Sequence, residues 1–168
     1  DHKFDGGVLA NNGKVIFSPD WRDVGIFDPT DNSFELVDIS SAISSNRNFM
    51  SAVLANDGKV ILTPGNADSV GVFDPSCEDT GTAIAHNPPS SSNPGEFTLV
   101  DIGSKVTSNL KFAASHVLAN DGKIIFPPYF ADGVGVFDPA DNSFELVDIS
   151  SAITGTYKFA AAALANNG

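Results

Sequence analysis

The chain has 168 residues, of which 42% are apolar and 18% charged, a composition that argues against intrinsic disorder. Its formal net charge of −12 argues against nucleic acid and favours basic partners, because binding a phosphate backbone requires clustered Lys and Arg. No run approaches the roughly 20 apolar residues of a transmembrane helix, and the first residues lack a signal-peptide pattern. Cys77 is the single cysteine, which excludes an intrachain disulfide and a cysteine-based zinc site and leaves the compartment unassigned.

The first 40 residues predict four short strands joined by turns. Apolar runs at residues 7–10, 14–17, 24–27 and 34–39 are separated by turn sequences, and we name them strands A to D. Asn12-Gly13 predicts a two-residue hairpin turn with positive φ, and Asp28-Pro29 predicts a turn whose carboxylate accepts backbone N–H groups. The strands are apolar on both sides, which predicts a sheet covered on both faces, with strand D as its outer edge.

This unit of four strands recurs along the chain. The segment Val8–Phe17 returns as Val53–Leu62 and Val117–Phe126, and in shortened form as Ala163–Gly168. The turn glycines are 45, 64 and 46 residues apart, at Gly13, Gly58, Gly122 and Gly168. The long second unit therefore contains an insertion of about 17 residues between Ser76 and Gly95, whose Ser, Pro and Asn content predicts a surface loop.

Four antiparallel strands in each period of about 46 residues are typical of the blades of an all-β propeller. The sequence predicts one propeller segment over residues 1–168, with three four-stranded antiparallel blades and the opening hairpin of a fourth. The predicted blades cover residues 4–48, 49–111 with the insertion at 76–95, 112–158, and 159–168. Propellers usually close with four to eight blades, so the remaining blades are expected from the same longer chain or from a homo-oligomer.

Two blocks carry a resemblance to a known family. Gly13–Phe17 followed by Val24–Leu36 resembles the kelch repeat, and it is also similar to the YVTN-type propeller repeat of surface-layer proteins. Two departures separate the chain from kelch proper: Ser18-Pro19 replaces the Gly-Gly pair after strand B, and Phe34 replaces the Trp. The resemblance implies that partners bind the face formed by the loops between strands B and C.

These B–C loops differ between the copies, whereas the strands hardly change, and loops are where binding residues concentrate. Trp, Tyr and Arg are enriched in interface hot spots. The predicted binding residues are Trp21, Arg22, Asn66, Asp68, Tyr129, Phe130 and Asp132. An alternative for the aromatic members is that they fill space between the blades.

Acidic and basic residues recur at fixed positions of the repeat. Asp23, Asp68 and Asp132 precede strand C, while Lys3, Lys111 and Lys158 precede the first Phe of strand A. This pattern predicts ion pairs between blades or turn capping. A ring of aspartates around a cation is the alternative, but one carboxylate from each blade is a thin ligand supply, and the sequence predicts no metal site.

The sequence shows no catalytic constellation and predicts no cofactor. His2, His86 and His116 fall at different positions of the repeat, and Cys77 lies beside Glu78 and Asp79, which disfavour a thiolate. The predicted function is a non-catalytic module that binds a protein or small ligand, as an accessory or scaffold subunit of a larger assembly. The alternative is a propeller-fold enzyme of lyase, hydrolase or oxidase type with its site at the channel mouth.

Overall fold

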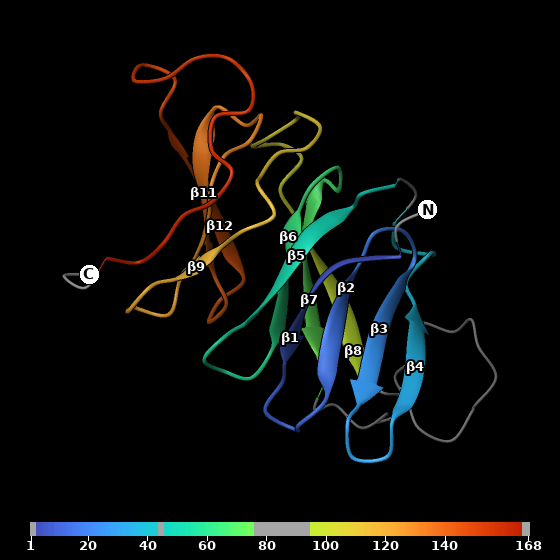
Figure 1. The fold of residues 1–168 in the computed structure, drawn as a ribbon. Coiled ribbons are helices and arrows are strands. Elements are labelled where there is room, and N and C mark those ends of the chain that lie inside the picture. The colour runs from blue at the N-terminus through green and yellow to red at the C-terminus, as the bar shows by residue number, and fades with distance from the viewer. Residues whose placement is uncertain (1–2, 44–45, 76–94, 166–168) are drawn as a thin grey trace.

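The computed structural model describes residues 3–43, 46–75 and 95–165, and all regular structure in these ranges is β. The insertion at 76–94, Cys77, His2 and His86 lie outside the described residues. The strands form three antiparallel sheets of four in sequence order, so each sheet is one blade (Figure 1). Blade 1 contains β1 (Phe4–Leu9), β2 (Val15–Pro19), β3 (Asp23–Asp28) and β4 (Ser33–Asp38).

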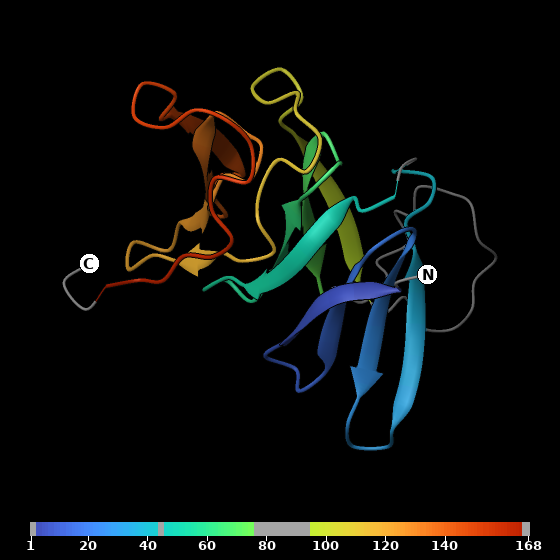
Figure 2. The ribbon, with the colours of Figure 1, turned by 45° about the horizontal axis from the view of Figure 1, so that its top comes forward.

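Blade 2 contains β5 (Phe49–Leu54), β6 (Val60–Pro64), β7 (Ser69–Asp74) and β8 (Glu96–Asp101). Blade 3 contains β9 (Val117–Leu118), β10 (Ile124–Phe126), β11 (Gly133–Asp138) and β12 (Ser143–Asp148). Blade 2 stands between the other two, and strand D is an edge of every sheet, as predicted (Figures 1 and 2).

Strand A is longer than predicted in blades 1 and 2 and shorter than predicted in blade 3. In blade 1 it begins at Phe4 rather than at residue 7, and a bulge between Phe4 and Gly6 keeps the earlier residues paired with β2. In blade 3 it shrinks to β9 and an isolated bridge between Phe112 and Pro128. The reason is one extra residue: Phe112 lies ten residues before its turn glycine, whereas Phe4 lies nine before Gly13.

The A–B turn is longer than predicted. Gly13 has a φ of 84°, but Asn12 does not share this positive φ, so the turn is not the two-residue type expected from Asn-Gly. The N–H of Gly13 donates to the carbonyl of Ala10 at 3.0 Å, and the N–H of Ala10 donates to that of Lys14 at 2.9 Å. The loop is therefore three residues long, and only its glycine needs the left-handed conformation.

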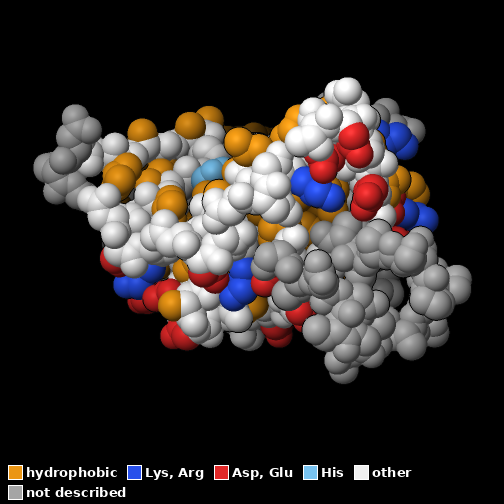
Figure 3. Space-filling model, turned by 90° about the horizontal axis from the view of Figure 1, so that it is seen from below, with side chains coloured by type: hydrophobic (Ala, Val, Ile, Leu, Met, Phe, Trp, Pro, Cys, Tyr) orange, Lys and Arg blue, Asp and Glu red, His pale blue; other side chains and the backbone are white. Residues whose placement is uncertain are grey.

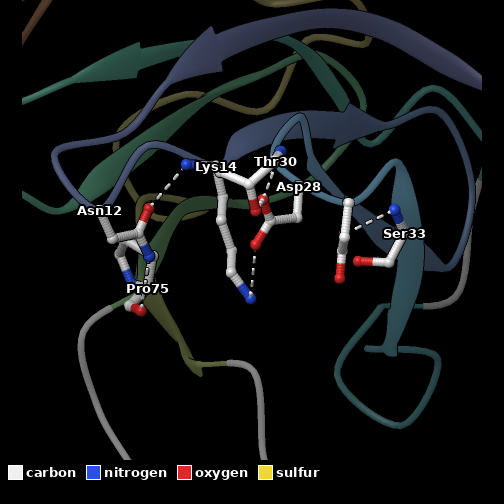
Figure 4. A network of polar contacts seen from close by, with 7 residues as sticks. Asn12, Lys14, Asp28, Thr30, Ser33 and Pro75 are labelled. Carbon is white, nitrogen blue, oxygen red and sulfur yellow. Dashed lines mark hydrogen bonds and ion pairs between the residues drawn. The ribbon is translucent and has the colours of Figure 1, made fainter.

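The hairpin ends also tie blade 1 to blade 2. Asn12 Nδ2 donates to the carbonyl of Pro75 at 3.2 Å, while its Oδ1 accepts the N–H of Lys14 at 3.1 Å (Figure 4). Asp28 accepts the N–H of Thr30 at 2.9 Å, which confirms the predicted role of the Asp-Pro turn. The Asn12–Pro75 hydrogen bond therefore links the A–B turn of blade 1 to the end of β7 in blade 2.

Each blade has two apolar faces of different composition. The aromatic face carries the ring of the first residue of strand A and its aromatic neighbours, as in Phe112, Phe126 and Phe144, while the aliphatic face carries Ile and Val, as in Ile16 and Val24. The aliphatic face of blade 1 packs on the aromatic face of blade 2, and the aliphatic face of blade 2 packs on the aromatic face of blade 3. The prediction that both faces are covered therefore holds for blade 2.

A glycine in strand C makes room for the aromatic ring. A Cβ atom at Gly135 would lie 2.8 Å from the Phe112 ring, one at Gly71 3.0 Å from the Phe49 ring, and one at Gly25 2.8 Å from the Phe4 ring. Real Cβ atoms essentially never lie closer than 3.0 Å to another heavy atom, so a Cβ atom at these positions would force the ring to shift. The Val-Gly-Val/Ile-Phe repeat is therefore a packing requirement, because the ring lies directly on the backbone of strand C.

Gly135→Ala is expected to lower the free energy of unfolding by about 1–3 kcal/mol, because the new methyl group must displace the buried Phe112 ring. Gly6→Ala is the matched control, since the nearest atom to its added Cβ is 3.6 Å away. Urea unfolding followed by tryptophan fluorescence measures both. Equal effects of the two substitutions would contradict the packing argument.

Candidate binding surface on the loop side

The B–C loops and the connections between blades lie on one side of the molecule, which we call the loop side. In each blade a residue just after strand D donates its N–H to a B–C loop carbonyl: Ile39 to Arg22, Ile102 to Asp68, and Ile149 to Asp132, at 2.8, 2.8 and 3.0 Å. These bonds hold each loop against the chain that leads to the next blade. The loop side is therefore built by loops and connections from all three blades (Figure 2).

Lysine–aspartate pairs join successive repeats on this side, as predicted. Lys111 Nζ lies 2.9 Å from Oδ1 of Asp68, and Lys158 Nζ lies 3.3 Å from Oδ1 of Asp132. The lysine side chains are 1% exposed, whereas the aspartates are 71% and 78% exposed. Each ammonium group also donates to a carbonyl two residues before the aspartate, that of Asn66 or Phe130, at 3.3 Å. We call this arrangement the lysine clasp.

The residue before each clasp position has an unusual backbone. Arg47, Leu110 and Tyr157 have φ values of 54°, 46° and 57°. This left-handed conformation costs a non-glycine residue about 1–2 kcal/mol, so three equivalent instances indicate a structural requirement. The reversal turns the following side chain inward, beneath the preceding B–C loop.

The junction between blades 1 and 2 has a different clasp. Asn48 stands where the other junctions have lysine, and its Nδ2 donates to the carbonyl of Trp21 at 3.1 Å, in the manner of Lys111 and Lys158. An amide cannot balance the charge of Asp23. Partial burial and the nearby Asp38 raise the pKa of Asp23, against smaller lowering effects of Arg22 and Lys3. Sequence reasoning missed this exception, although the alignment of the repeats shows it.

Asn48→Lys is expected to stabilise the protein by about 0.5–1 kcal/mol, because it supplies the missing cation to Asp23 while keeping the donor to Trp21. Thermal unfolding at neutral pH measures the effect. The control is the same substitution in an Asp23→Asn background, where the gain should vanish. A gain that persists without the aspartate would refute the clasp explanation.

Aromatic side chains reach the surface of the loop side at two places, where Trp21 and Tyr157 are exposed and Tyr129 and Phe130 are half-buried. Trp21 is 50% exposed, and the guanidinium of Arg22 lies 4.0 Å from the centre of its ring. Tyr129 and Phe130 stack with ring centres 5.3 Å apart, and Tyr157 meets both edge-on at 5.1 and 4.9 Å. The last three rings form one cluster, which we call the aromatic trio.

Tyr157 belongs to the trio although the sequence did not single it out, and it is 65% exposed. It comes from the connection after blade 3, while its two partners come from the B–C loop, so only the folded chain brings the three together. The one available signal is its place before Lys158, where Leu110 and Arg47 stand in the other repeats. The trio is therefore peculiar to this end of the molecule.

Asn66 and the aspartates have roles inside the loop side. Asn66 Oδ1 accepts the N–H of Leu110 at 2.9 Å, and its Nδ2 donates to the carbonyl of Asn46 at 2.8 Å, so it links the connections on both sides of blade 2. Asp68 and Asp132 hold clasp lysines. Among the described residues, no group of three potential ligands could hold a metal ion.

A polar pocket of about 370 Å³ opens between blades 2 and 3. Its walls come from the connection after β8, the third B–C loop and β12, and include Ser108, Phe130, Asp132, Asp148 and Ser150. Lys105 lies at its edge, where Nζ donates to the carbonyl of Phe144. The pocket thus joins two of the predicted binding residues, Phe130 and Asp132, and borders the trio.

His116, which directly precedes β9, makes a polar contact with Ser51 in strand A of blade 2. Its Nδ1 lies 3.2 Å from Oγ of Ser51, which lies 2.9 Å from Oγ1 of Thr63. Burial lowers the pKa of His116. His116, Ser51 and Thr63 thus form a chain of three polar side chains, and in the described part of the structure no carboxylate completes it.

Several aspartates outside the clasps have lowered pKa values because they accept local hydrogen bonds. The hydroxyl and N–H groups of Thr30 lower the pKa of Asp28. In the same way, the hydroxyl and N–H groups of Ser33 lower the pKa of Asp31, and those of Ser143 lower the pKa of Asp141. Each such group stabilises the fold above its unfolded pKa of about 4, and this contribution is lost as the pH falls through the folded value. Acid should therefore weaken the turns between strands C and D.

The free energy of unfolding is expected to fall as the pH drops below about 4, and Asp28→Asn should flatten this dependence. Asn can accept the same backbone N–H but does not titrate. Urea unfolding at pH 6 and about pH 3 measures both proteins. A wild-type stability that is unchanged over this range would contradict the assignment.

The comparisons with known proteins identify the fold. No family model matches the chain, and no curated protein does. A streptogramin B lyase structure matches 99% of this chain and 46% of that chain at a TM-score of 0.68 with 16% identity. The extracellular domain of the putative hybrid two component system BT3049 from B. thetaiotaomicron matches 92% of this chain and 18% of its own chain. The TM-score is 0.59 and the sequence identity 13%. The Cps50 (Swd1) β-propeller domain of Myceliophteria thermophila matches 84% of this chain and 39% of its own chain. The TM-score is 0.52 and the sequence identity 11%.

The chain has the β-propeller fold. It spans less than half the length of each of these three proteins. One of them is a lyase, one is an extracellular domain of a two component system, and one is the Swd1 propeller domain. Identities this low carry the fold alone. The described part of this propeller segment contains no helix of the length and apolarity that a membrane span requires.

Proposed function

We propose that this propeller segment is a non-catalytic binding module that presents its loop side to a protein partner, as an accessory or scaffold subunit of a larger assembly. The observation that carries the proposal is the exposure of large aromatic side chains on that side. Trp21 is 50% and Tyr157 65% exposed, and both lie beside cationic or aromatic neighbours that restrain them. Rigid, exposed aromatic and Arg side chains are typical interface anchors.

Two further features support the choice of the loop side as the binding surface. Its B–C loops differ from blade to blade while the strands repeat, which suits a surface that recognises one partner on a uniform scaffold. The resemblance to kelch repeats, whose partners bind the equivalent face, agrees with this choice. Asn66, Asp68 and Asp132 remain in the proposed surface as the polar frame that holds the aromatic anchors.

A peptide selection tests the proposal. A random 12-residue phage-displayed library is selected on the wild-type chain, and individual peptides are then measured against variants. Peptides that bind are expected to lose at least tenfold in affinity with Trp21→Ala or Tyr157→Ala, because these exposed rings are the proposed anchors.

Thr30→Ala is the matched control, because Thr30 is exposed in the turn between β3 and β4, on the opposite side of the blade. Selected peptides should bind this variant as they bind the wild type. Peptides that bind all three variants equally, or that lose affinity only with the control, would refute the loop side as the binding surface.

A second candidate is a propeller-fold enzyme, and the contact between His116 and Ser51 favours it. If His116 activates this serine, a fluorophosphonate probe should label Ser51 in the wild type and fail to label His116→Ala. The binding proposal expects no labelling at Ser51 in either protein. Mass spectrometry of the labelled chain distinguishes the two functions.

A further inference from the structure

Three equivalent turns join strands A and B, and the first of them differs from the other two in one side chain. It reads Asn12-Gly13, whereas the second and third read Asp57-Gly58 and Asp121-Gly122. In all three turns the glycine has a positive φ, and its N–H donates to the carbonyl three residues earlier at 3.0 Å. The turns therefore share one backbone arrangement, and the first carries an amide where the others carry a carboxylate.

The Asn12 side chain makes two hydrogen bonds from an exposed position. It lies on the side of the molecule that carries the turns, where acidic side chains and lysines lie along the surface (Figure 3). Its Oδ1 accepts the N–H of Lys14 at 3.1 Å, and its Nδ2 donates to the carbonyl of Pro75 at 3.2 Å (Figure 4). The first bond holds the side-chain carbonyl beside the backbone of its own turn, and the second reaches blade 2.

The sequence Asn-Gly allows a covalent reaction within this turn. The backbone nitrogen of Gly13 and the Cγ atom of Asn12 become neighbours in a five-membered ring when the nitrogen attacks the side-chain carbonyl. Glycine has no Cβ atom to hinder this approach. The N–H of Lys14, which donates to Oδ1, stabilises the negative charge that develops on this oxygen during the attack.

We propose that Asn12 is a site of spontaneous deamidation, and that the reaction releases blade 1 from its hydrogen bond to Pro75. The bond between the Gly13 nitrogen and Asn12 Cγ forms while this nitrogen gives its proton to water or hydroxide and Nδ2 leaves as ammonia. Water then opens the cyclic imide at one of its two carbonyls, which yields aspartate or isoaspartate at position 12. The proposal concerns the turns and does not rest on the function of the loop side.

The folded turn restrains this reaction without preventing it. The N–H of Gly13 donates to the carbonyl of Ala10, and this bond must open before the nitrogen can attack. An exposed turn opens locally far more often than the whole chain unfolds. We therefore expect deamidation of the folded protein, at a rate set by the opening of the turn.

The second and third turns show the contacts available to the aspartate product. Asp57 and Asp121 each accept the N–H of the lysine two residues later at 3.2 Å. The same carboxylates lie 3.0 and 3.1 Å from the ammonium groups of Lys59 and Lys123. An aspartate thus fits this turn and pairs with the lysine that follows the glycine.

Lys14 is the counterpart of these two lysines, and its Nζ lies 3.9 Å from Oδ2 of Asp28 (Figure 4). An aspartate at position 12 offers Lys14 a carboxylate within its own turn. A carboxylate has no N–H to donate to the carbonyl of Pro75. Deamidation therefore exchanges a contact between two blades for an ion pair within one turn.

Peptide mapping of the full-length protein tests the proposal. The wild type is incubated at about 37 °C at pH 6 and at pH 8, and is then digested with trypsin. The enzyme releases residues 4–14 as one peptide, because Lys3 and Lys14 are the flanking cleavage sites. The second Asn-Gly sequence, Asn167-Gly168, lies outside the described residues and is recovered in a separate peptide, 159–168.

Aspartate and isoaspartate are expected to accumulate at position 12, faster at pH 8 than at pH 6, because the attacking nitrogen must lose its proton. Asn32 is the internal control, since it is also exposed in a turn but precedes Ser33, whose side chain hinders the attack. Asn12 should react several times faster than Asn32. Asn12→Gln should stop the reaction at this position, because its longer side chain closes a larger ring.

Two results of the mapping overturn the proposal. One is a position 12 that stays unchanged over a period in which Asn32 reacts. The other is aspartate at position 12 without isoaspartate, because direct hydrolysis of the side-chain amide gives aspartate alone and does not involve the Gly13 nitrogen.

The variant Asn12→Asp reproduces the aspartate product and tests the new ion pair. Lys14→Gln is expected to lower the melting temperature more in the Asn12→Asp background than in the wild type, and about 0.5 M salt should remove this difference. Lys123→Gln, in the third turn, is the control and should have the same effect in both backgrounds. Equal effects of Lys14→Gln in the two backgrounds at low salt would overturn the exchange of contacts.

Discussion

The packing of an aromatic ring on the backbone of a strand is the interaction on which the other features depend. In each blade the first Phe of the strand A segment lies over a glycine of strand C, and its partner rings lie on the same face. The ring can then meet the flat aliphatic face of the preceding blade, as Phe49 and Phe112 do. The stacking direction of the blades follows, because the two faces of a sheet are not interchangeable.

This direction places the lysine clasps. The chain leaves strand D, reverses at a left-handed residue such as Leu110, and inserts the next side chain beneath the loop it has just passed. A buried ammonium group needs both a counter-charge and hydrogen-bond acceptors, and the B–C loop offers an aspartate and a carbonyl. The clasp therefore fixes the loops relative to one another, which gives the loop side a defined shape for recognition.

The loop side and the faces of the blades differ in what packs against them. Trp21 and the trio are scattered in loops of unlike sequence, so they suit a partner with its own matching features. The blade faces are regular and repeat-derived, so the neighbouring blade complements them. Recognition and blade packing can thus use different parts of the chain, because the first lies on loops and the second on the faces of sheets.

The sequence alone determined the number of strands and their grouping into blades, because the repeat shows the same strand and turn residues at the same positions three times. The recurring lysines and aspartates predicted ion pairs between blades or turn capping, and the structure shows ion pairs for Lys111 and Lys158. The covered faces followed from the apolar strands. One extra residue before His116 shortened strand A of blade 3, which a pattern of residue types does not reveal, since pairing depends on register.

Only the tertiary structure decided which loop residues meet. Tyr157 joins Tyr129 and Phe130 although they lie more than 25 residues apart, and Asn66 links the connections on both sides of blade 2. The physical reason is that loops have no periodic pattern. Their contacts are set by how the chain turns between blades, and that path depends on the packing of whole sheets rather than on neighbouring residues.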